Sequence, residues 1–251
     1  MISGERKIEI CCDSIRSAIT AMNAGADRIE LCDNLIEGGT TPSYGTIAIV
    51  RDAINIKLHV LIRPRAGDFL YDDGEYEIMK KDIDICKKSG VDGVVTGMLN
   101  KNGSIDRKRT KELVEIAYPM SVTFHRAFDL CRDPYSSIED IISCGADRIL
   151  TSGQHNKALD GTELISTLVK IAAGRIIIMP GSGLDESNIK EIAVRTGASE
   201  FHLTGRKTID SAMEFRRDGI QMGGIPGIAE YSRKVADQEL IRRIINILKN
   251  L

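Results

Sequence analysis

A short pattern recurs four times along this chain of 251 residues, and it limits the folds that the chain can adopt. Each copy has a glycine after a helical stretch, then an acidic or small residue, then a short apolar run that ends in a polar group. The copies are GADRIELC (25–32), GVDGVVTG (90–97), GADRILTSG (145–153) and GASEFHLTG (197–205). The glycine suits the left-handed position that ends a helix. The run after it has the β-branched character of a parallel strand buried on both faces.

Four further segments read as strands between these copies, namely Lys7–Cys12, Leu58–Arg63, Ser121–Arg126 and Arg175–Met179. Amphipathic helical patterns separate the strands, for example at Ser14–Asn23, Glu75–Ser89, Arg107–Ala117, Ser136–Cys144 and Glu186–Thr196. Eight strands that alternate with helices give a closed parallel barrel or a long open sheet. No glycine-rich dinucleotide turn follows the first strand, which favours the barrel. We therefore predict an α/β protein with a single (β/α)₈ TIM-barrel domain over residues 1–251.

The segment from Lys207 to Leu251 departs from the repeat and is predicted to be less regular. Residues 218–227 (DGIQMGGIPG) have turn chemistry and predict a loop. A last helix is expected at Gln238–Leu248.

Composition excludes several classes of partner. The net charge is −2 and basic runs are absent, so nothing favours binding to nucleic acid or to an acidic membrane surface. The first ten residues carry charges where a signal peptide needs its apolar stretch, and no segment approaches the roughly 18 apolar residues of a membrane span. A cytoplasmic protein is expected, and its six cysteines, which form no C-x-x-C pair, should be reduced thiols.

Alternate residues of a barrel strand face the interior, and here the interior positions are unusually polar. A structural barrel would fill them with Val, Ile and Leu. Because buried charges are costly unless they are paired or used, convergence of so many polar groups predicts a small-molecule site at the carboxyl ends of the strands, where barrels carry function. The alternative is a satisfied Glu–Arg network that plugs the barrel. The expected inward residues are Glu9, Cys11, Arg28, Glu30, Cys32, His59, Leu61, Arg63, Thr123, His125, Arg148, Leu150, Ser152, Glu200, His202 and Thr204.

Two loops combine arginine with acidic residues. Arg63, Arg65 and Asp68 follow the third strand, and Arg126 and Asp129 follow the fifth. Guanidinium groups bind carboxylate or phosphate through two hydrogen bonds at once, so these loops are candidates for anion recognition. A salt-bridge network that ties neighbouring loops together is the alternative.

Glycine-rich turns follow the seventh and eighth strands. Gly181 and Gly183 precede a helix, and Gly205 follows the eighth strand. Backbone amides in such turns bind anions in many phosphate-binding barrels. This position therefore adds to the prediction of an anion site.

Cys11 and Cys32 each lie two residues beyond an inward glutamate, Glu9 and Glu30, near the ends of neighbouring strands. Adjacent strands are about 4.8 Å apart, so the two sulfurs approach closely if the register agrees. Soft thiolates favour Cu(I) or zinc over hard ions, and zinc normally takes four ligands. The pair is therefore a candidate Cu(I) site, to which a glutamate, His59 or His202 could add donors. The alternative is that both are buried cysteines that act as small apolar residues.

The chain resembles the CutC copper homeostasis family from about Glu9 to Arg217. The resemblance rests on the motifs EICCDS (9–14), GADRIELC, EGGTTPS (37–43), IRPRAGDFLY (62–71), TFHRAFD (123–129), RILTSG (148–153) and MPGSG (179–183). It implies a cytoplasmic barrel, often a homodimer, that is associated with copper tolerance. Cys11 and Cys32 match the cysteines proposed to bind Cu(I) in some members of that family.

Two functions follow from these observations. The first is binding or buffering of Cu(I) by Cys11 and Cys32. The second is an enzyme, such as a lyase, isomerase or hydrolase, that acts on a small anionic or phosphorylated metabolite. In that enzyme Glu30 or Glu9 would be the general base and His125 the acid or electrophile. Arg63 and Arg126 would clamp the anion. A purely structural barrel is the third interpretation.

Overall fold

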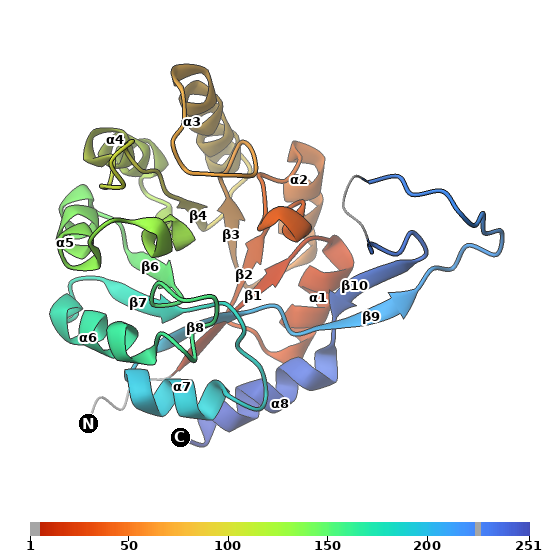
Figure 1. Ribbon diagram of the computed structural model, residues 1–251. Helices are drawn as coiled ribbons and strands as arrows, with labels where there is room; N and C mark the ends of the chain where they lie inside the picture. Colours follow the sequence, from red (N-terminus) through yellow and green to blue (C-terminus); the bar gives the residue numbers. More distant parts are fainter. Residues whose placement is uncertain (1–5, 224–226) are drawn as a thin grey trace.

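The computed structural model describes residues 6–223 and 227–251, and Figure 1 shows their arrangement. Eight parallel strands alternate along the described chain with helices that surround them, so the predicted (β/α)₈ barrel is confirmed. The strands are β1 Lys7–Cys12, β2 Arg28–Leu31, β3 Lys57–Leu61, β4 Gly93–Thr96, β5 Ser121–Phe124, β6 Arg148–Thr151, β7 Ile177–Pro180 and β8 Glu200–Leu203. The α-helices are α1 Ile15–Ala24, α2 Tyr44–Ala53, α3 Asp73–Lys88, α4 Arg107–Ala117, α5 Pro134–Cys144, α6 Thr162–Ala172, α7 Ile189–Thr196 and α8 Gln238–Lys249. Two 3₁₀ helices, η1 Leu35–Glu37 and η2 Arg126–Leu130, follow β2 and β5.

The strands are hydrogen-bonded in the order β7-β6-β5-β4-β3-β2-β1-β8. The edge strands β7 and β8 lie against each other, which brings the sheet nearly to closure. No ladder of hydrogen bonds joins these two strands in the described part of the chain. The barrel therefore has a seam between β7 and β8.

The acidic residue of the repeat joins neighbouring strands. The amide of Asp27 donates to the carbonyl of Ile8 at 3.0 Å, and the Asp27 carboxylate accepts from the Ile8 amide at 2.8 Å. Asp92 makes the same two contacts with Leu58, and Asp147 makes them with Val122. Each aspartate thus holds an odd-numbered strand to the even-numbered strand that follows it. The fourth copy has Ser199 at this position and adjoins the seam.

The apolar core lies mainly between the strands and the surrounding helices. Outward residues of the strands, such as Ile10, Ile29 and Val60, are fully buried there, and Cys12 joins them beneath the helices as the alternation predicts. A separate small apolar cluster inside the barrel consists of Cys11, Cys32, Leu61 and Val95, with Leu35 packed against it. The alternation of each strand therefore separates an outer core from the polar interior.

The C-terminal segment contains two strands that the sequence pattern did not indicate. β9, Arg206–Asp210, pairs antiparallel with β10, Ser232–Ala236, and the pair extends away from the barrel as an arm (Figure 1). The predicted loop at 218–227 lies on this arm, although its residues 224–226 are outside the described ranges. The expected last helix is α8, which begins after the Asp237 cap and packs against α1 and α7.

Candidate functional site

A cavity of about 470 Å³ opens at the carboxyl ends of the strands. We call it the mouth cavity. The lining residues lie near the carboxyl ends of seven strands or in the loops that follow them. Many of them are the strand residues that were predicted from the sequence to face inward. The lining residues are Cys11, Glu30, Cys32, Leu35, Gly38, Leu61, Arg63, Phe69, His125, Arg126, Leu150, Ser182, Gly183, Leu184, His202, Leu203 and Thr204.

Two thiols meet on one wall of the mouth cavity. Cys11 on β1 is paired in register with Glu30 on β2, and Cys32 directly follows β2. The two sulfur atoms are 3.7 Å apart. A hydrogen bond with Cys32 and the neighbouring His202 outweigh burial and lower the pKa of Cys11 to about 5. Burial raises the pKa of Cys32 well above its ordinary value. The pair therefore favours a Cys11 thiolate that accepts from the Cys32 thiol.

His202 on β8 lies between two glutamates. Its Nδ1 is 2.7 Å from Oε1 of Glu9, and its Nε2 is 3.6 Å from Oε2 of Glu30. The same Glu30 oxygen is 3.4 Å from the Cys32 sulfur. Burial alone would lower the pKa of His202, but Glu30, Cys11 and Glu9 raise it well above its ordinary value. Burial raises the pKa of Glu30 well above the usual range. Thiol, carboxyl and imidazole groups thus form one continuous cluster.

Glu9 belongs to a layer beneath the mouth cavity and does not line it. Its carboxylate accepts from Nε of Arg28, and Arg28 also donates to Glu200 at 2.7 Å. Arg148 donates to the same Glu200 oxygen at 2.8 Å. Burial would raise the pKa of Glu9, but Arg28 and then His202 hold it below the usual range. This layer is a satisfied Glu–Arg network, the alternative that the sequence left open, and it supports His202 from below.

Arg63 also lines the mouth cavity, and its environment differs from that of every other charged group there. The residue is only 5% exposed. Its guanidinium donates to three backbone carbonyls, those of Glu37 at 3.1 Å, Gly39 at 2.5 Å and Gly67 at 2.9 Å. It also lies over the ring of Phe69, 5.2 Å from the centroid. No carboxylate lies within 4.0 Å of it among the residues that the structure describes.

His125 contacts the same phenyl ring as Arg63. Its ring lies 4.8 Å from that of Phe69, and its Nδ1 accepts from the backbone amide of Ala127 at 3.1 Å. Burial and the charge of Arg63 lower the pKa of His125 to about 3. The imidazole is therefore neutral, with its proton on Nε2. Nε2 is buried and has no hydrogen-bond partner in the described residues.

Arg126, Asp129 and Ser152 form a closed network at the rim. Arg126 donates to Asp129 at 2.7 Å and to the Ser152 hydroxyl at 2.9 Å. Asp129 also accepts from the amide and hydroxyl of Ser152. The arrangement ties η2 to the loop after β6, which is the salt-bridge alternative stated for this loop. Arg126 still lines the cavity, with its charge neutralised by Asp129.

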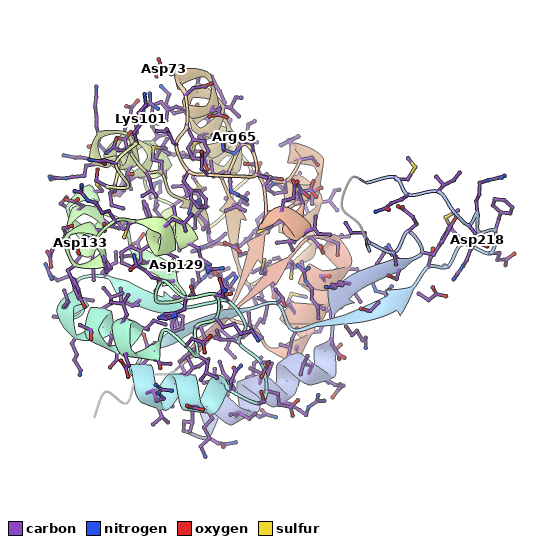
Figure 2. The ribbon with its side chains drawn as sticks, in the orientation of Figure 1. Arg65, Asp73, Lys101, Asp129, Asp133 and Asp218 are labelled. Carbon is purple, nitrogen blue, oxygen red and sulfur yellow. The ribbon has the colours of Figure 1, made fainter. Side chains whose placement is uncertain are left out.

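Besides Glu9, Asp129 and Ser152, four predicted site residues do not line the mouth cavity, namely Arg65, Asp68, Gly181 and Gly205. Arg65 pairs with Glu75 and with the exposed Asp68. Figure 2 shows Arg65 beside α3, whereas Asp129 of the rim network lies over the strands. Gly181 packs so closely that an added Cβ would be 2.4 Å from Leu150. Gly205 would place a Cβ 2.5 Å from Ile241 of α8 in the same way. Of the predicted glycines, Gly183 alone is a lining residue.

The apolar wall is the part of the site that sequence reasoning missed. Leu35 begins η1, and Phe69 and Leu184 lie in loops, so none of them has a strand alternation that could assign it an inward direction. The one available signal was that Phe69 directly follows Arg63-Pro-Arg-Ala-Gly-Asp in the loop already singled out.

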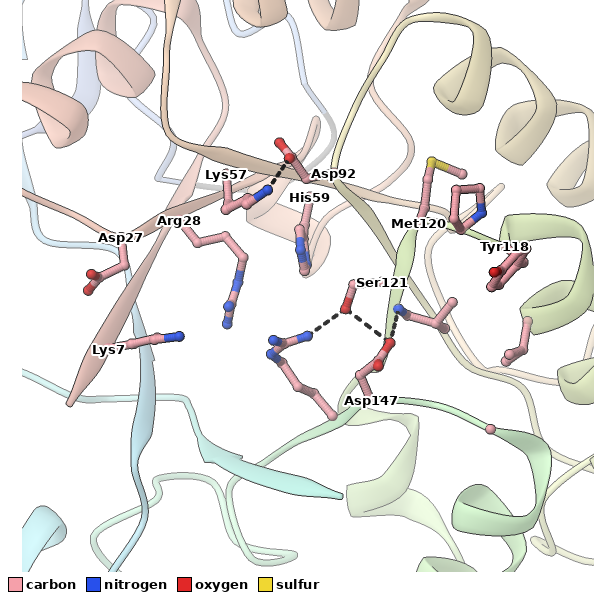
Figure 3. Close-up of a pocket in the computed structure, with 15 residues that line it drawn as sticks. Lys7, Asp27, Arg28, Lys57, His59, Asp92, Tyr118, Met120, Ser121 and Asp147 are labelled. Atoms are coloured by element: carbon pink, nitrogen blue, oxygen red, sulfur yellow. Dashed lines mark hydrogen bonds and ion pairs between the residues drawn. The ribbon is translucent and has the colours of Figure 1, made fainter. Parts of the chain in front are cut away.

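A second cavity, of about 560 Å³, opens at the opposite end of the barrel and is shown in Figure 3. Lys57 pairs there with Asp92 at 2.7 Å, and the hydroxyl of Ser121 donates to Asp147 at 3.0 Å. His59 lines this lower cavity, and burial lowers its pKa to about 4. His59 was a possible further metal donor, but the structure places it away from the mouth cavity. In barrels this face serves stability, whereas active sites lie at the carboxyl ends of the strands.

Comparison with known proteins decides the family. The model of the CutC family matches residues 6–207. The chain belongs to the CutC family. A human copper homeostasis protein cutC homolog is 46% identical over 244 residues, which is 97% of this chain and 89% of the human protein. The family protein CutC of Chromobacterium violaceum is 46% identical over 96% of this chain and 97% of its own.

A crystal structure of a CutC copper homeostasis protein from Streptococcus agalactiae superposes on this CutC chain with a TM-score of 0.76. The two are 35% identical, over 79% of this chain and 98% of the other. The described helices of this CutC protein include none long and apolar enough to cross a bilayer.

Proposed function

We propose that this CutC protein binds Cu(I) through Cys11 and Cys32 at the mouth cavity. The observation that supports this function is the distance of 3.7 Å between two sulfurs that both line the cavity. Soft thiolate ligands select Cu(I), and a low-coordinate soft cation needs no more than such a pair. Binding or buffering of copper is the molecular role that this site would give to a member of a copper homeostasis family.

Neighbouring groups fit a metal at this position. One oxygen of Glu30 lies with the two sulfurs in a group whose ligand atoms are all within 4.8 Å of one another. His202 presents Nε2 toward Glu30, while Glu9 holds its Nδ1. A carboxylate on the second nitrogen is the usual way in which a metal-binding histidine is oriented. His202 and Glu30 are therefore the donors available to assist the two sulfurs.

The proposed function requires thiols that stay reduced. A reducing cytoplasm provides that condition, whereas an oxidising compartment favours disulfides. We accordingly propose the cytoplasm as the place of action. Cys12, Cys86, Cys131 and Cys144 are also buried free thiols, but the structure brings none of them within sulfur contact of another cysteine.

The test is a competition titration of reduced protein with a chromogenic Cu(I) chelator under anaerobic conditions. We expect one Cu(I) per chain in the wild type and loss of that binding in the Cys11→Ser/Cys32→Ser variant. The matched control is Cys131→Ala/Cys144→Ala, which removes two buried thiols elsewhere and should keep the copper. Binding of equal strength by the wild type and the Cys11→Ser/Cys32→Ser variant would disprove the thiol site.

A further inference from the structure

The wall of the mouth cavity carries one positive charge that nothing in the described chain neutralises. Arg126 is paired with Asp129 at 2.7 Å, and His202 lies between two glutamates. Arg63 donates to backbone carbonyls and lies over the Phe69 ring, and no carboxylate of the described residues pairs with it, although it is as buried as the core. A buried charge without a counter-ion is costly. The unmatched guanidinium therefore indicates a place for an anion.

A second buried donor lies beside this guanidinium. The Nδ1 atom of His125 accepts from Ala127, so Nε2 carries the proton, and Nε2 has no partner among the described residues. Buried N–H groups in native proteins are nearly always hydrogen-bonded. His125 and Arg63 both line the mouth cavity and both contact Phe69. A charged and a neutral donor thus lie against the same phenyl ring of the wall.

We propose that Arg63 and His125 bind the carboxylate of a small organic monoanion inside the mouth cavity. One unmatched positive charge balances one negative charge, whereas a phosphate dianion would leave an excess. The cavity, at about 470 Å³, lies within the range of roughly 300 to 1,000 Å³ that is typical of small-molecule sites. Apolar side chains also line the cavity beside the polar ones, which favours a carboxylate with a short apolar tail. These side chains are Leu35, Leu61, Phe69, Leu150, Leu184 and Leu203.

This site goes beyond copper binding and does not depend on it. The thiol pair lies with Glu30 and His202, whereas the carboxylate site consists of Arg63 and His125. It also narrows the earlier expectation of an anion clamp. Arg126 is neutralised by Asp129 and Arg65 lies outside the cavity, so neither takes part.

The competing explanation is that Arg63 serves only to anchor loops, through the carbonyls of Glu37, Gly39 and Gly67. That explanation accounts for its position but predicts no binding of anions. Calorimetric titration with sodium acetate and sodium propionate, at constant ionic strength and pH 7, separates the two. We expect saturable binding of both. Propionate should bind about fourfold more tightly, because its additional CH₂ group is buried against the apolar wall.

The decisive variant is Arg63→Met, with Arg65→Met as its matched control. Arg65 is an arginine of the same loop but is paired with Glu75 outside the cavity. We expect Arg63→Met to weaken propionate binding on the order of 10- to 100-fold, which is the size of a lost charge-assisted hydrogen bond. Arg65→Met should bind propionate as the wild type does. Equal binding by Arg63→Met and the wild type overturns the proposal.

A second variant guards against misfolding of Arg63→Met. His125→Asn keeps an oxygen that can accept from Ala127 and removes the Nε2 donor, so it tests the same site with the loop intact. We expect weaker propionate binding in His125→Asn and unchanged binding in Cys11→Ser/Cys32→Ser. Tighter binding of inorganic phosphate than of propionate by the wild type, or absence of saturable carboxylate binding, overturns the proposal and leaves the copper site untouched.

Discussion

Burial of a neutral histidine makes the stability of this protein depend on pH in a calculable way. The pKa of His125 is lowered to about 3 in the folded protein, against the ordinary value of 6.5. As the pH falls below 6.5, the unfolded chain gains a proton at this residue and the folded protein does not. The unfolded state is then favoured, so the contribution of His125 to stability falls in acid.

The size of this effect follows from the two pKa values. Between pH 7 and pH 5, one histidine with these values lowers the free energy of unfolding by about 2 kcal/mol. The perturbation is His125→Asn, which cannot titrate in this range and retains an acceptor for the Ala127 amide. Other groups titrate as well, so the quantity of interest is the difference between the two proteins.

The assay is urea unfolding of the wild type and of His125→Asn at pH 7 and pH 5, with free energies from linear extrapolation. We expect the drop in free energy from pH 7 to pH 5 to be smaller in the variant by about 2 kcal/mol. A general loss of packing in the variant would lower both free energies equally and leave this difference intact. Equal drops in the two proteins would refute the reasoning, as would an NMR titration of His125 with a midpoint near 6.5 in the folded protein.

Two further predictions concern the barrel interior. Arg28→Met leaves Glu9 and Glu200 buried without the guanidinium that they share. The free energy of unfolding, measured in urea, should therefore fall by about 3–5 kcal/mol. A loss below about 1 kcal/mol would show that other groups neutralise the two carboxylates. Gly93→Ala places a Cβ 2.5 Å from Nε2 of His59. The free energy of unfolding should therefore fall by about 1–3 kcal/mol, which is measured as a lower midpoint temperature of thermal unfolding. An unchanged midpoint would mean that the ring moves aside freely.

The barrel was predictable because two local signals coincide throughout the chain. Strand positions alternate with a period of two, and the glycine of each repeat ends a helix. Gly25, Gly145 and Gly197 indeed adopt left-handed conformations as helix caps. β9 and β10 were not predicted because most of their residues are polar or exposed on the arm, and only Val235 and Ala236, at the end of β10, are buried.

The sequence predicted many of the residues that line the site, but it did not predict which charged residues pair with each other. Alternation placed Cys11, Cys32 and His125 at the mouth, because direction along a strand is a local property. The sequence could not show that Arg63 lacks a carboxylate partner whereas Arg65, two residues later, has one. That difference arises from loops that leave the strand in irregular directions, and loop geometry is not encoded in a periodic pattern.

The three aspartates of the repeat and the seam have a shared mechanical consequence. Asp27, Asp92 and Asp147 each add two hydrogen bonds to the ladder between an odd-numbered strand and the strand that follows it. Separation of those strands must break these bonds as well. Between β7 and β8 neither the ladder nor the aspartate opposes separation. Breathing of the barrel should concentrate there, so amides at this boundary should exchange with deuterium earliest among the strands. Ser182 to Leu184 and His202 to Thr204 flank that boundary and also line the mouth cavity. The seam, which is the most easily deformed part of the barrel, is thus also the side at which the mouth cavity can widen.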